Sequence, residues 1–288
     1  MITVIGDLLA DIIVSKGATN FATDTDGSID ICPGGQANNV AAWIAHEGVA
    51  SRLIGKVGDD PFGIYLLDQA KKQGISCAVS VDPNAQTGKI VILVDRETGE
   101  RSMIPDRGAN LNLCESDIHG VEESDILYLS GYSFFEETTR KAIVAAKKTA
   151  ISKGIPVALD PSSTHFLRIC KDDFLRFLDG VTFLIPNYEE GVLLTGETDP
   201  HHILAALQEL VPCPVLKLGA DGCIFYENDV CVKLPAPKVT AVDVTGAGDS
   251  FIGSFLATYV TTKDMRKSVE RAIEISSQVV TRIGARPC

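Results

Sequence analysis

Short apolar runs alternate with amphipathic stretches along most of the chain. The stretch EETTRKAIVAAKKTAISKG at 136–154 has helical spacing. Four apolar runs predict short buried strands: ILYLSG at 126–131, VALD at 157–160, TFLIPN at 182–187 and VLKLG at 215–219. Strands separated by amphipathic helices indicate an α/β fold with a mainly parallel central sheet and helices on both faces. Ligands of such folds bind beyond the carboxyl ends of the strands.

Two segments, 12–33 and 87–105, depart from this pattern. Both are β-like and rich in turn residues, and the second predicts a hairpin around Asp95–Gly99. Two such excursions from a parallel sheet would form a small accessory sheet over its ligand edge. The chain shows no internal repeat and no long linker, so we expect one main domain over 1–288 with a β lid.

Composition narrows the classes of partner. A net charge of −12 opposes nucleic acid and anionic membrane surfaces as partners. No run reaches the roughly 20 apolar residues of a membrane span. The start, MITVIGDLLADIIV, predicts a pair of strands and lacks the basic region of a signal peptide. Eight cysteines without a C-x-x-C predict buried, reduced thiols. We therefore expect a cytoplasmic protein.

The segment DVTGAGDSFIGSFLA at 243–257 carries the strongest chemical signal. Gly246, Ala247 and Gly248 form a glycine-rich turn before an apolar helix that begins near Asp249. Glycines let successive N–H groups point at one ligand, and a helix N-terminus favours an anion such as a phosphoryl group. Asp249 is then placed to take the proton of an attacking hydroxyl. The alternative, an aspartate that merely caps the helix, has about equal weight on these residues alone.

A second glycine pair opens another expected helix, in PGGQANNVAAWIAHEG at 33–48. Gly34 and Gly35 permit close approach of the backbone to a ligand, and the Asn39 amide can both donate to and accept from hydroxyl groups. A plain turn followed by helix caps explains the same residues and is the simpler interpretation. Trp43, one turn further, is expected in the core.

Taken together, these segments resemble the PfkB, or ribokinase-type, carbohydrate kinase family. The GG-x-x-x-N helix start and the D-x-T-G-A-G-D-x-F segment occur in the family's order and spacing. Three further matches lie between them: GKVGDDPFG at 55–63, PNYEE at 186–190 and KLGADG at 217–222. The resemblance implies a three-layer α/β core with a small β lid. It also implies ATP and Mg²⁺ as cofactors and transfer of the γ-phosphate to a sugar hydroxyl.

Residue roles follow from the same resemblance. Asp249 matches the catalytic base, and the turn Gly246-Ala247-Gly248 matches the anion hole. Asn187 and Glu190 match the N-x-x-E motif that acts on Mg²⁺ and the phosphates, through water. The residues that match the nucleotide site are Asn187, Lys217, Gly219, Asp221, Gly222, Gly246 and Gly248.

The sugar and a monovalent cation have matching positions as well. Asp11 matches the acidic residue that accepts from sugar hydroxyls, and Gly34, Gly35 and Asn39 lie where the family contacts its sugar. Asp243 and Thr245 match the D-x-T of members activated by K⁺, with the carbonyls near Val279 and Gly284 completing that site. Cys288 stands where ribokinases often place a hydroxyl ligand.

The acceptor alcohol is less clearly indicated. Gln36 replaces the lysine of the ribokinase GGKGAN motif, Leu9 replaces an asparagine, and Ser130-Gly131-Tyr132 lacks the expected glutamate. Where the strand ends at Asp160 the chain reads DPSST, without the asparagine and the arginine of the D-x-N-x-R motif of ketodeoxygluconate kinases and many fructokinases. Arg107 would bind a carboxylate or a phosphate, unless it is an ordinary surface arginine.

Three alternatives to a sugar kinase remain at this point. A nucleoside kinase of the same fold is the first, although no aromatic pair for a base is evident. A regulator that binds sugar or nucleotide without transferring phosphate is the second, and the intact Gly246–Asp249 segment argues against it. A nicotinamide-dependent oxidoreductase lacks its early glycine fingerprint. We expect a homodimer that associates through the lid.

Overall fold

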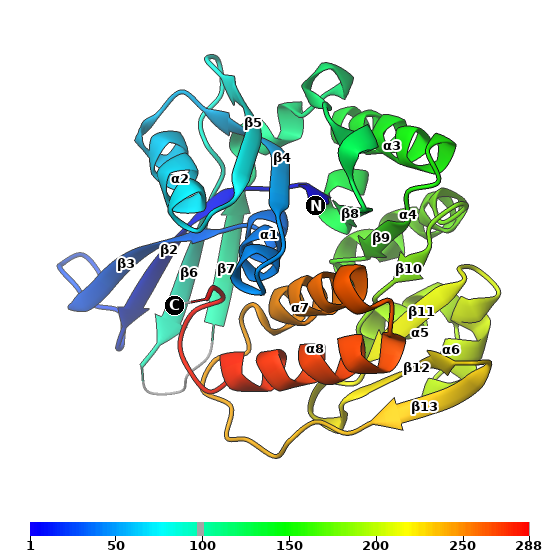
Figure 1. Ribbon diagram of the computed structural model, residues 1–288. Helices are drawn as coiled ribbons and strands as arrows, with labels where there is room; N and C mark the ends of the chain where they lie inside the picture. The colour runs from blue at the N-terminus through cyan, green and yellow to red at the C-terminus, as the bar shows by residue number, and fades with distance from the viewer. Residues whose placement is uncertain (97–100, 288) are drawn as a thin grey trace.

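Two β-sheets organise the chain, and the computed structural model describes residues 1–96 and 101–287 (Figure 1). The larger sheet has nine strands in the order β13-β12-β11-β10-β9-β8-β1-β4-β5. Its strands are β1 Ile2–Ile5, β4 Ser51–Gly58, β5 Ser76–Asp82, β8 Ile126–Ser130, β9 Val157–Asp160, β10 Phe183–Leu184, β11 Cys213–Lys217, β12 Cys223–Glu227 and β13 Val230–Leu234. β12 pairs antiparallel with both β11 and β13, and the other neighbouring strands of this sheet pair parallel. The prediction of a mainly parallel central sheet is confirmed.

Helices cover both faces of this sheet and complete the three expected layers. One buried cluster packs the sheet against α1 Gln36–His46, α2 Pro61–Lys72, α7 Ala247–Thr262 and α8 Met265–Val279. The other packs it against α3 Glu137–Ser152, α4 Thr164–Phe177, α5 Tyr188–Thr195 and α6 Pro200–Gln208. β8 and β9, which contact both clusters, are nearly continuous apolar runs, as is usual for strands buried on two faces.

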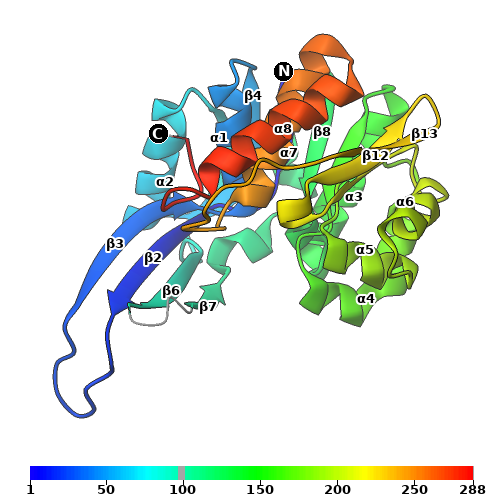
Figure 2. The ribbon, with the colours of Figure 1, turned by 90° about the horizontal axis from the view of Figure 1, so that it is seen from below.

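The smaller sheet has four strands in the order β3-β2-β6-β7 and projects beyond the core (Figure 2). Its strands are β2 Leu9–Lys16, β3 Gly27–Gly34, β6 Lys89–Asp95 and β7 Arg101–Asp106. They extend a few residues beyond the expected segments 12–33 and 87–105. The expected hairpin pairs β6 with β7, but residues 97–99 of the turn at Asp95–Gly99 lie outside the described part of the chain.

Two details of the sequence-based prediction are wrong. The strand expected over 182–187 pairs as a strand only at Phe183 and Leu184, because Pro186 has no N–H to donate. The cysteines were expected to be buried, and among the seven described, all free, only Cys223 is. The other six are partly exposed at element ends and helix surfaces.

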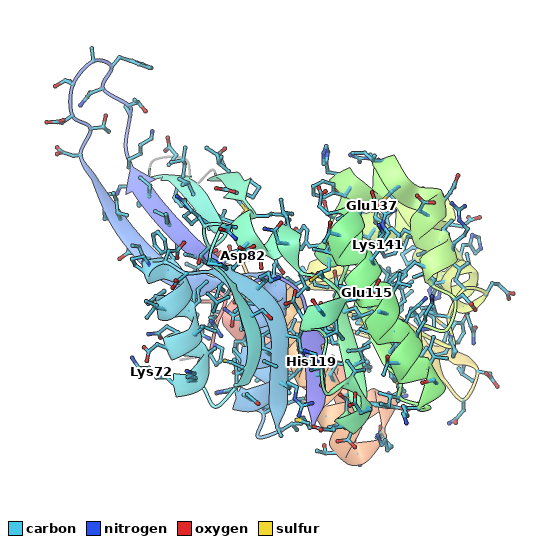
Figure 3. All side chains as sticks on the ribbon, turned by 90° about the horizontal axis from the view of Figure 1, so that it is seen from above. Lys72, Asp82, Glu115, His119, Glu137 and Lys141 are labelled. Carbon is cyan, nitrogen blue, oxygen red and sulfur yellow. The ribbon has the colours of Figure 1, made fainter. Side chains whose placement is uncertain are left out.

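The outer surface carries ordinary solvated charges. Glu115, His119 and the ion-paired Glu137 and Lys141 of α3 lie on one side of the molecule, away from the sheet edge discussed below (Figure 3). All of these side chains are exposed. Solvent screens an exposed pair of this kind, so it adds little to the stability of the fold.

Candidate active site

Asp249 is the third residue of α7 and lies at the carboxyl edge of the large sheet. Its Oδ2 accepts a 2.8 Å hydrogen bond from Nδ2 of Asn39 on α1. The cap of α7 is Gly246, and no side chain caps this end. The interpretation of Asp249 as a helix cap is therefore wrong, since its carboxylate is directed across to α1.

The surroundings of Asp249 adjust its acidity. Loss of water raises the pKa of its carboxyl to about 7, although the hydrogen bond from Asn39 lowers it. The negative charges of Asp160 and Asp7 contribute to this rise in the pKa. A carboxylate with a pKa near neutrality is well matched to accept a proton at physiological pH.

The turn before Asp249 needs its glycines. Gly246 has a φ of 76°, in the left-handed region, and a Cβ there would overlap Ala285. At Gly248 the nearest atom to an added Cβ is the Lys217 Nζ, at 3.7 Å, so the backbone there faces open space. N–H groups at the start of a helix favour an anion in that space.

A cavity of about 630 Å³ extends from this turn to the loop after β11, a volume within the usual range for sites that bind a small molecule. Gly222 has a φ of 91°, and a Cβ there would overlap the Leu234 carbonyl. The sequence-predicted nucleotide residues that line the cavity are Asn187, Lys217, Gly219, Asp221, Gly222 and Gly248.

Asn187 and Glu190 form a reciprocal cap at the start of α5. The Glu190 N–H donates to Asn187 Oδ1 at 2.8 Å, and the Asn187 N–H donates to Glu190 Oε2 at 2.9 Å. Burial raises the pKa of Glu190 to about 8, and Asp160 adds to the rise. Within the described residues no group of three acidic, histidine or cysteine side chains could hold a metal directly. The donors fit Mg²⁺ held through water and phosphate.

Asp11, on β2, faces a confined space. A Cβ at Gly34 would overlap its carboxylate, and its Oδ1 is buried with no hydrogen-bond partner. Burial, together with the charge of Asp7, raises the pKa of Asp11 to about 7. Gly35 has a φ of 92°, and its Cβ would lie 2.5 Å from the Asp7 carbonyl oxygen. Asn39 Oδ1 is also buried without a partner. Asp11 Oδ1 and Asn39 Oδ1 can therefore both accept hydrogen bonds from a ligand.

Arg107 is not a surface arginine. Its guanidinium lies 4.1 Å from the ring centre of Tyr132 and 3.4 Å from Oδ2 of Asp7, with 18% of the side chain exposed. It follows β7 and borders a second pocket, of about 280 Å³. The aromatic residues of that pocket, which the sequence did not reveal as a group, are Tyr132, Phe135 and Phe166.

The residues of the predicted cation site also come together. The Asp243 carboxylate accepts from the Thr245 N–H at 2.8 Å and from the Gly284 N–H at 3.1 Å. The loop before α7 is thereby joined to the loop after α8. Cys288 lies outside the described residues.

Several residues of the site were not assigned a role from the sequence. Asp7 follows β1, Gln36 begins α1 and Asp160 ends β9, and the rule that singled out Asn187 would have found them. Arg286 has no local signal, because its Nη2 donates to Asn38, 248 residues away. Burial lowers the pKa of Arg286 to about 10, although the nearby Tyr65, Asp11 and Asp249 act to raise it.

A family model described as pfkB family carbohydrate kinase matches residues 1–288. The chain belongs to this family. As a PfkB carbohydrate kinase it is an ATP-dependent sugar kinase. The probable fructokinase-5 of Arabidopsis thaliana is 29% identical over 267 residues, covering 89% of this PfkB chain and 82% of the plant protein.

Solved structures share the fold of this PfkB chain. The adenosine kinase from Sinorhizobium meliloti superposes with a TM-score of 0.90 at 25% identity, covering 99% of this chain and 95% of that one. A putative ribokinase II from E. coli, in complex with ATP and Mg²⁺, gives 0.89 at 24% identity over 99% and 94%. Within the described residues, no helix of this PfkB kinase is both long and apolar enough to cross a membrane.

Proposed function

We propose that this PfkB kinase phosphorylates a hydroxyl of a small sugar, with Asp249 as the catalytic base. One observation carries the proposal: Asp249 accepts a hydrogen bond from the Asn39 amide and directly follows Gly248, whose backbone lines the 630 Å³ cavity. A sugar on the Asn39 side would meet the γ-phosphate of ATP at this carboxylate. The whole chain acts as one kinase domain, with segments 12–33 and 87–105 as its lid.

The reaction follows from this placement. The acceptor hydroxyl gives its proton to Asp249 while its oxygen bonds to the γ-phosphorus, and the bond to the β–γ bridging oxygen breaks to release ADP. The N–H groups of Gly246, Ala247 and Gly248 would bind the phosphoryl oxygens as charge develops on them. Mg²⁺ in the ATP complex would neutralise phosphate charge, held through water near Asn187 and Glu190. Activation by K⁺ at Asp243, Thr245 and Gly284 stays a prediction.

Asp11, Gly34, Gly35 and Asn39 would bind the sugar. The Asp11 carboxylate accepts from two adjacent hydroxyls, and the unpartnered Asn39 Oδ1 accepts from a third. Arg107 lies across Asp7 from this position and would contact a substituent of the acceptor.

A nucleoside kinase is the second candidate, and the aromatic pocket favours it. The rings of Phe135 and Phe166 stack with centres 4.7 Å apart, and Tyr132 lies under Arg107 in the same pocket. Aromatic faces of this kind suit a flat base attached to the sugar.

The test is ADP release from Mg·ATP with ribose, fructose, deoxyribose, ketodeoxygluconate, inositol, adenosine and pseudouridine as acceptors. One acceptor with kcat/KM well above the rest would establish the reaction. A preference for adenosine or pseudouridine would assign the aromatic pocket to the base. A panel without turnover, together with ligand-dependent thermal stabilisation, would favour a regulator that only binds.

The pH dependence of the rate tests the base. Because Asp249 must be deprotonated and its pKa is about 7, we expect kcat/KM to fall about tenfold per pH unit below neutrality and to level off above it. Asn39→Leu removes a hydrogen bond that lowers this pKa, so the acid limb should move to higher pH. An Asp11→Asn variant shows which carboxyl titrates in the profile: if the acid limb remains in this variant, it belongs to Asp249. A limb near pH 4 would contradict the assignment.

We further propose a homodimer formed through the lid. Ile31, Ile12, Val91 and Ile104 lie side by side across the four lid strands, on the face opposite Asp11. The side chains of Ile31 and Ile104 are 48% and 58% exposed, and apolar sheet faces of this kind associate.

Light scattering checks the dimer. The wild-type protein should have twice the chain mass, and Ile31→Lys with Ile104→Lys should reduce it to one chain. Ile151→Lys, on exposed α3, is the matched control and should leave the mass unchanged. A wild-type monomer at working concentration would reject the proposal. A cytoplasmic location also stays a prediction, supported by the seven free cysteines.

A further inference from the structure

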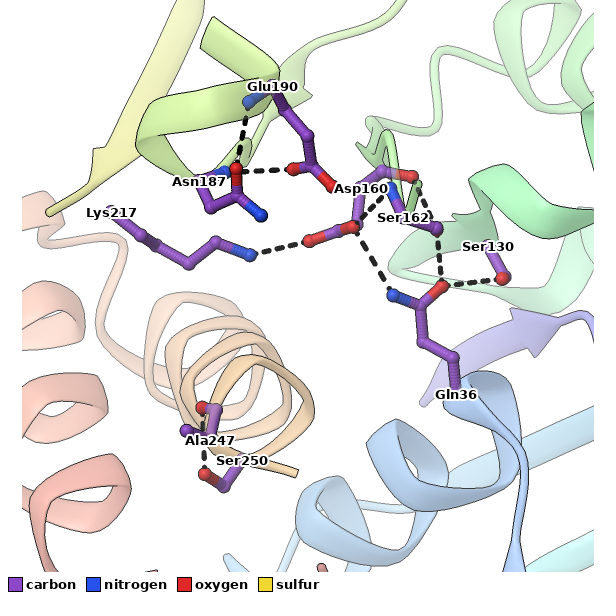
Figure 4. A network of polar contacts seen from close by, with 9 residues as sticks. All are labelled: Gln36, Ser130, Asp160, Ser162, Asn187, Glu190, Lys217, Ala247 and Ser250. Atoms are coloured by element: carbon purple, nitrogen blue, oxygen red, sulfur yellow. Dashed lines mark hydrogen bonds and ion pairs between the residues drawn. The ribbon is translucent and has the colours of Figure 1, made fainter. Parts of the chain in front are cut away.

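A buried chain of polar contacts runs from α1 to the nucleotide cavity (Figure 4). Its centre is Asp160, the last residue of β9, with only 2% of its surface exposed. Asp160 Oδ2 binds the Lys217 Nζ at 2.6 Å, and Oδ1 accepts from the Ser162 N–H at 2.7 Å. Burying a carboxylate and an ammonium together costs desolvation free energy, which their attraction and further hydrogen bonds must offset.

Gln36 fixes the other side of this carboxylate. Its Nε2 donates to Asp160 Oδ1 at 3.2 Å, while its Oε1 accepts from the hydroxyls of Ser130, at 2.5 Å, and Ser162, at 2.6 Å. The amide cannot be reversed, because its oxygen would then face a carboxylate. Ser162 has a φ of 70°, a left-handed conformation that non-glycine residues rarely adopt. The direction of Asp160 is therefore set from three sides.

Lys217 is the other end of the chain of contacts. It lines the 630 Å³ cavity, and its Nζ lies close to Gly248 in the turn before Asp249. Burial acts to lower the pKa of Lys217, but the charges of Asp160 and Glu190 outweigh it and raise the pKa. The side chain is thus a charged ammonium where the cavity meets the turn.

We propose that Asp160 is a positioning residue for phosphoryl transfer, which acts by holding the Lys217 ammonium against the transferring group. The inference rests on the proposed function and deepens it. Lys217 would touch the γ-phosphoryl oxygens, whose charge shifts as the acceptor oxygen bonds to phosphorus and the bond to ADP breaks. Gln36 and Asn39 both lie on α1. The helix that orients Asp160 through Gln36 is therefore the one that hydrogen-bonds to Asp249 through Asn39.

The pairing has a distinctive consequence for binding. Before reaction, Asp160 and the γ-phosphate compete for one ammonium, which limits how tightly ATP is held in the ground state. Interactions that are stronger in the transition state than in the ground state raise kcat. Removing the Asp160 charge should therefore favour ATP binding and yet slow the reaction, whereas loss of Lys217 should harm both.

Calorimetric titration with Mg·ATP and Mg·ADP tests this without any acceptor. Lys217→Met should weaken ATP binding at least tenfold and ADP binding less than threefold. Asp160→Asn should tighten ATP binding about threefold, and with an acceptor from the panel its kcat should fall at least tenfold. Lys147→Met removes another buried lysine, bound to the Phe177 and Asp179 carbonyls, and should leave the ratio of ATP to ADP affinity unchanged.

Opposite results would overturn the proposal. An unchanged affinity ratio in Lys217→Met would remove Lys217 from the γ-phosphate. Equal weakening of ATP and ADP in a folded Asp160→Asn protein would make Asp160 merely structural. If that variant unfolds, Gln36→Met serves instead, because it leaves the Asp160–Lys217 pair in place but less firmly oriented. It should tighten ATP binding and lower kcat, each by less than Asp160→Asn. Because the affinities need no acceptor, failure of the proposed sugar reaction would be recognised separately.

Discussion

Asp249→Asn should lower kcat by about 10³-fold or more, within the range found for loss of a general base. The amide keeps the shape and the contact with Asn39 but cannot accept the hydroxyl proton. Affinity for Mg·ATP should change little, because Asp249 is not among the residues that line the nucleotide cavity. The measurement is ADP release at saturating acceptor, with ATP affinity from calorimetry.

Asp264→Asn is the control for this substitution. Asp264 caps the N-terminus of α8 through the Lys267 N–H, beyond the opposite end of α7 from the turn. That variant should lose a little thermal stability and no activity. Wild-type turnover in Asp249→Asn would mean that another group takes the proton. A regulator without kinase activity would instead keep its ligand affinities and show no turnover in either protein.

Asp11→Asn should lower kcat/KM for the acceptor by about 10²-fold, since hydrogen bonds to a charged group contribute about 1.5–3 kcal/mol each. Its amide replaces one acceptor by a donor and cannot receive two adjacent hydroxyls. The KM for ATP should stay as in the wild type. Steady-state kinetics with each substrate varied in turn separates the two effects.

Asp30→Asn is the matched control for the lid. Asp30 lies on β3 opposite Ile13, on the same face of the small sheet as Asp11, but it is exposed. Its removal should leave both KM values unchanged. A similar loss in both variants would point to a general effect of lid charge, and the assignment of Asp11 to the sugar would then fail.

The fold was accessible from the sequence where local pattern decides structure. The apolar runs at 126–131, 157–160 and 215–219 became β8, β9 and β11, because strands buried on both faces are continuously hydrophobic. The glycine-rich turns could also be predicted from the sequence, since Gly35, Gly222 and Gly246 adopt backbone conformations that other residues avoid.

The site was accessible only in part, because its chemistry depends on distant contacts. Asn39 and Asp249 were each singled out, but their hydrogen bond joins residues 210 apart. Asp160 was not predicted to act in the site, since its partners Gln36 and Lys217 belong to other elements. The aromatic pocket likewise draws on residues from separate segments, whose rings meet only in the folded chain.

Residues late in the chain complete structure begun by the earliest ones. Ala285 accepts a hydrogen bond from Trp43, and Arg286 donates to Asn38, both on α1. During synthesis, α1 is therefore without these partners until residue 286 has left the ribosome. Contacts of such long sequence separation form late and slowly. A nascent chain released before these residues are made would thus lack two contacts to the helix that carries Asn39.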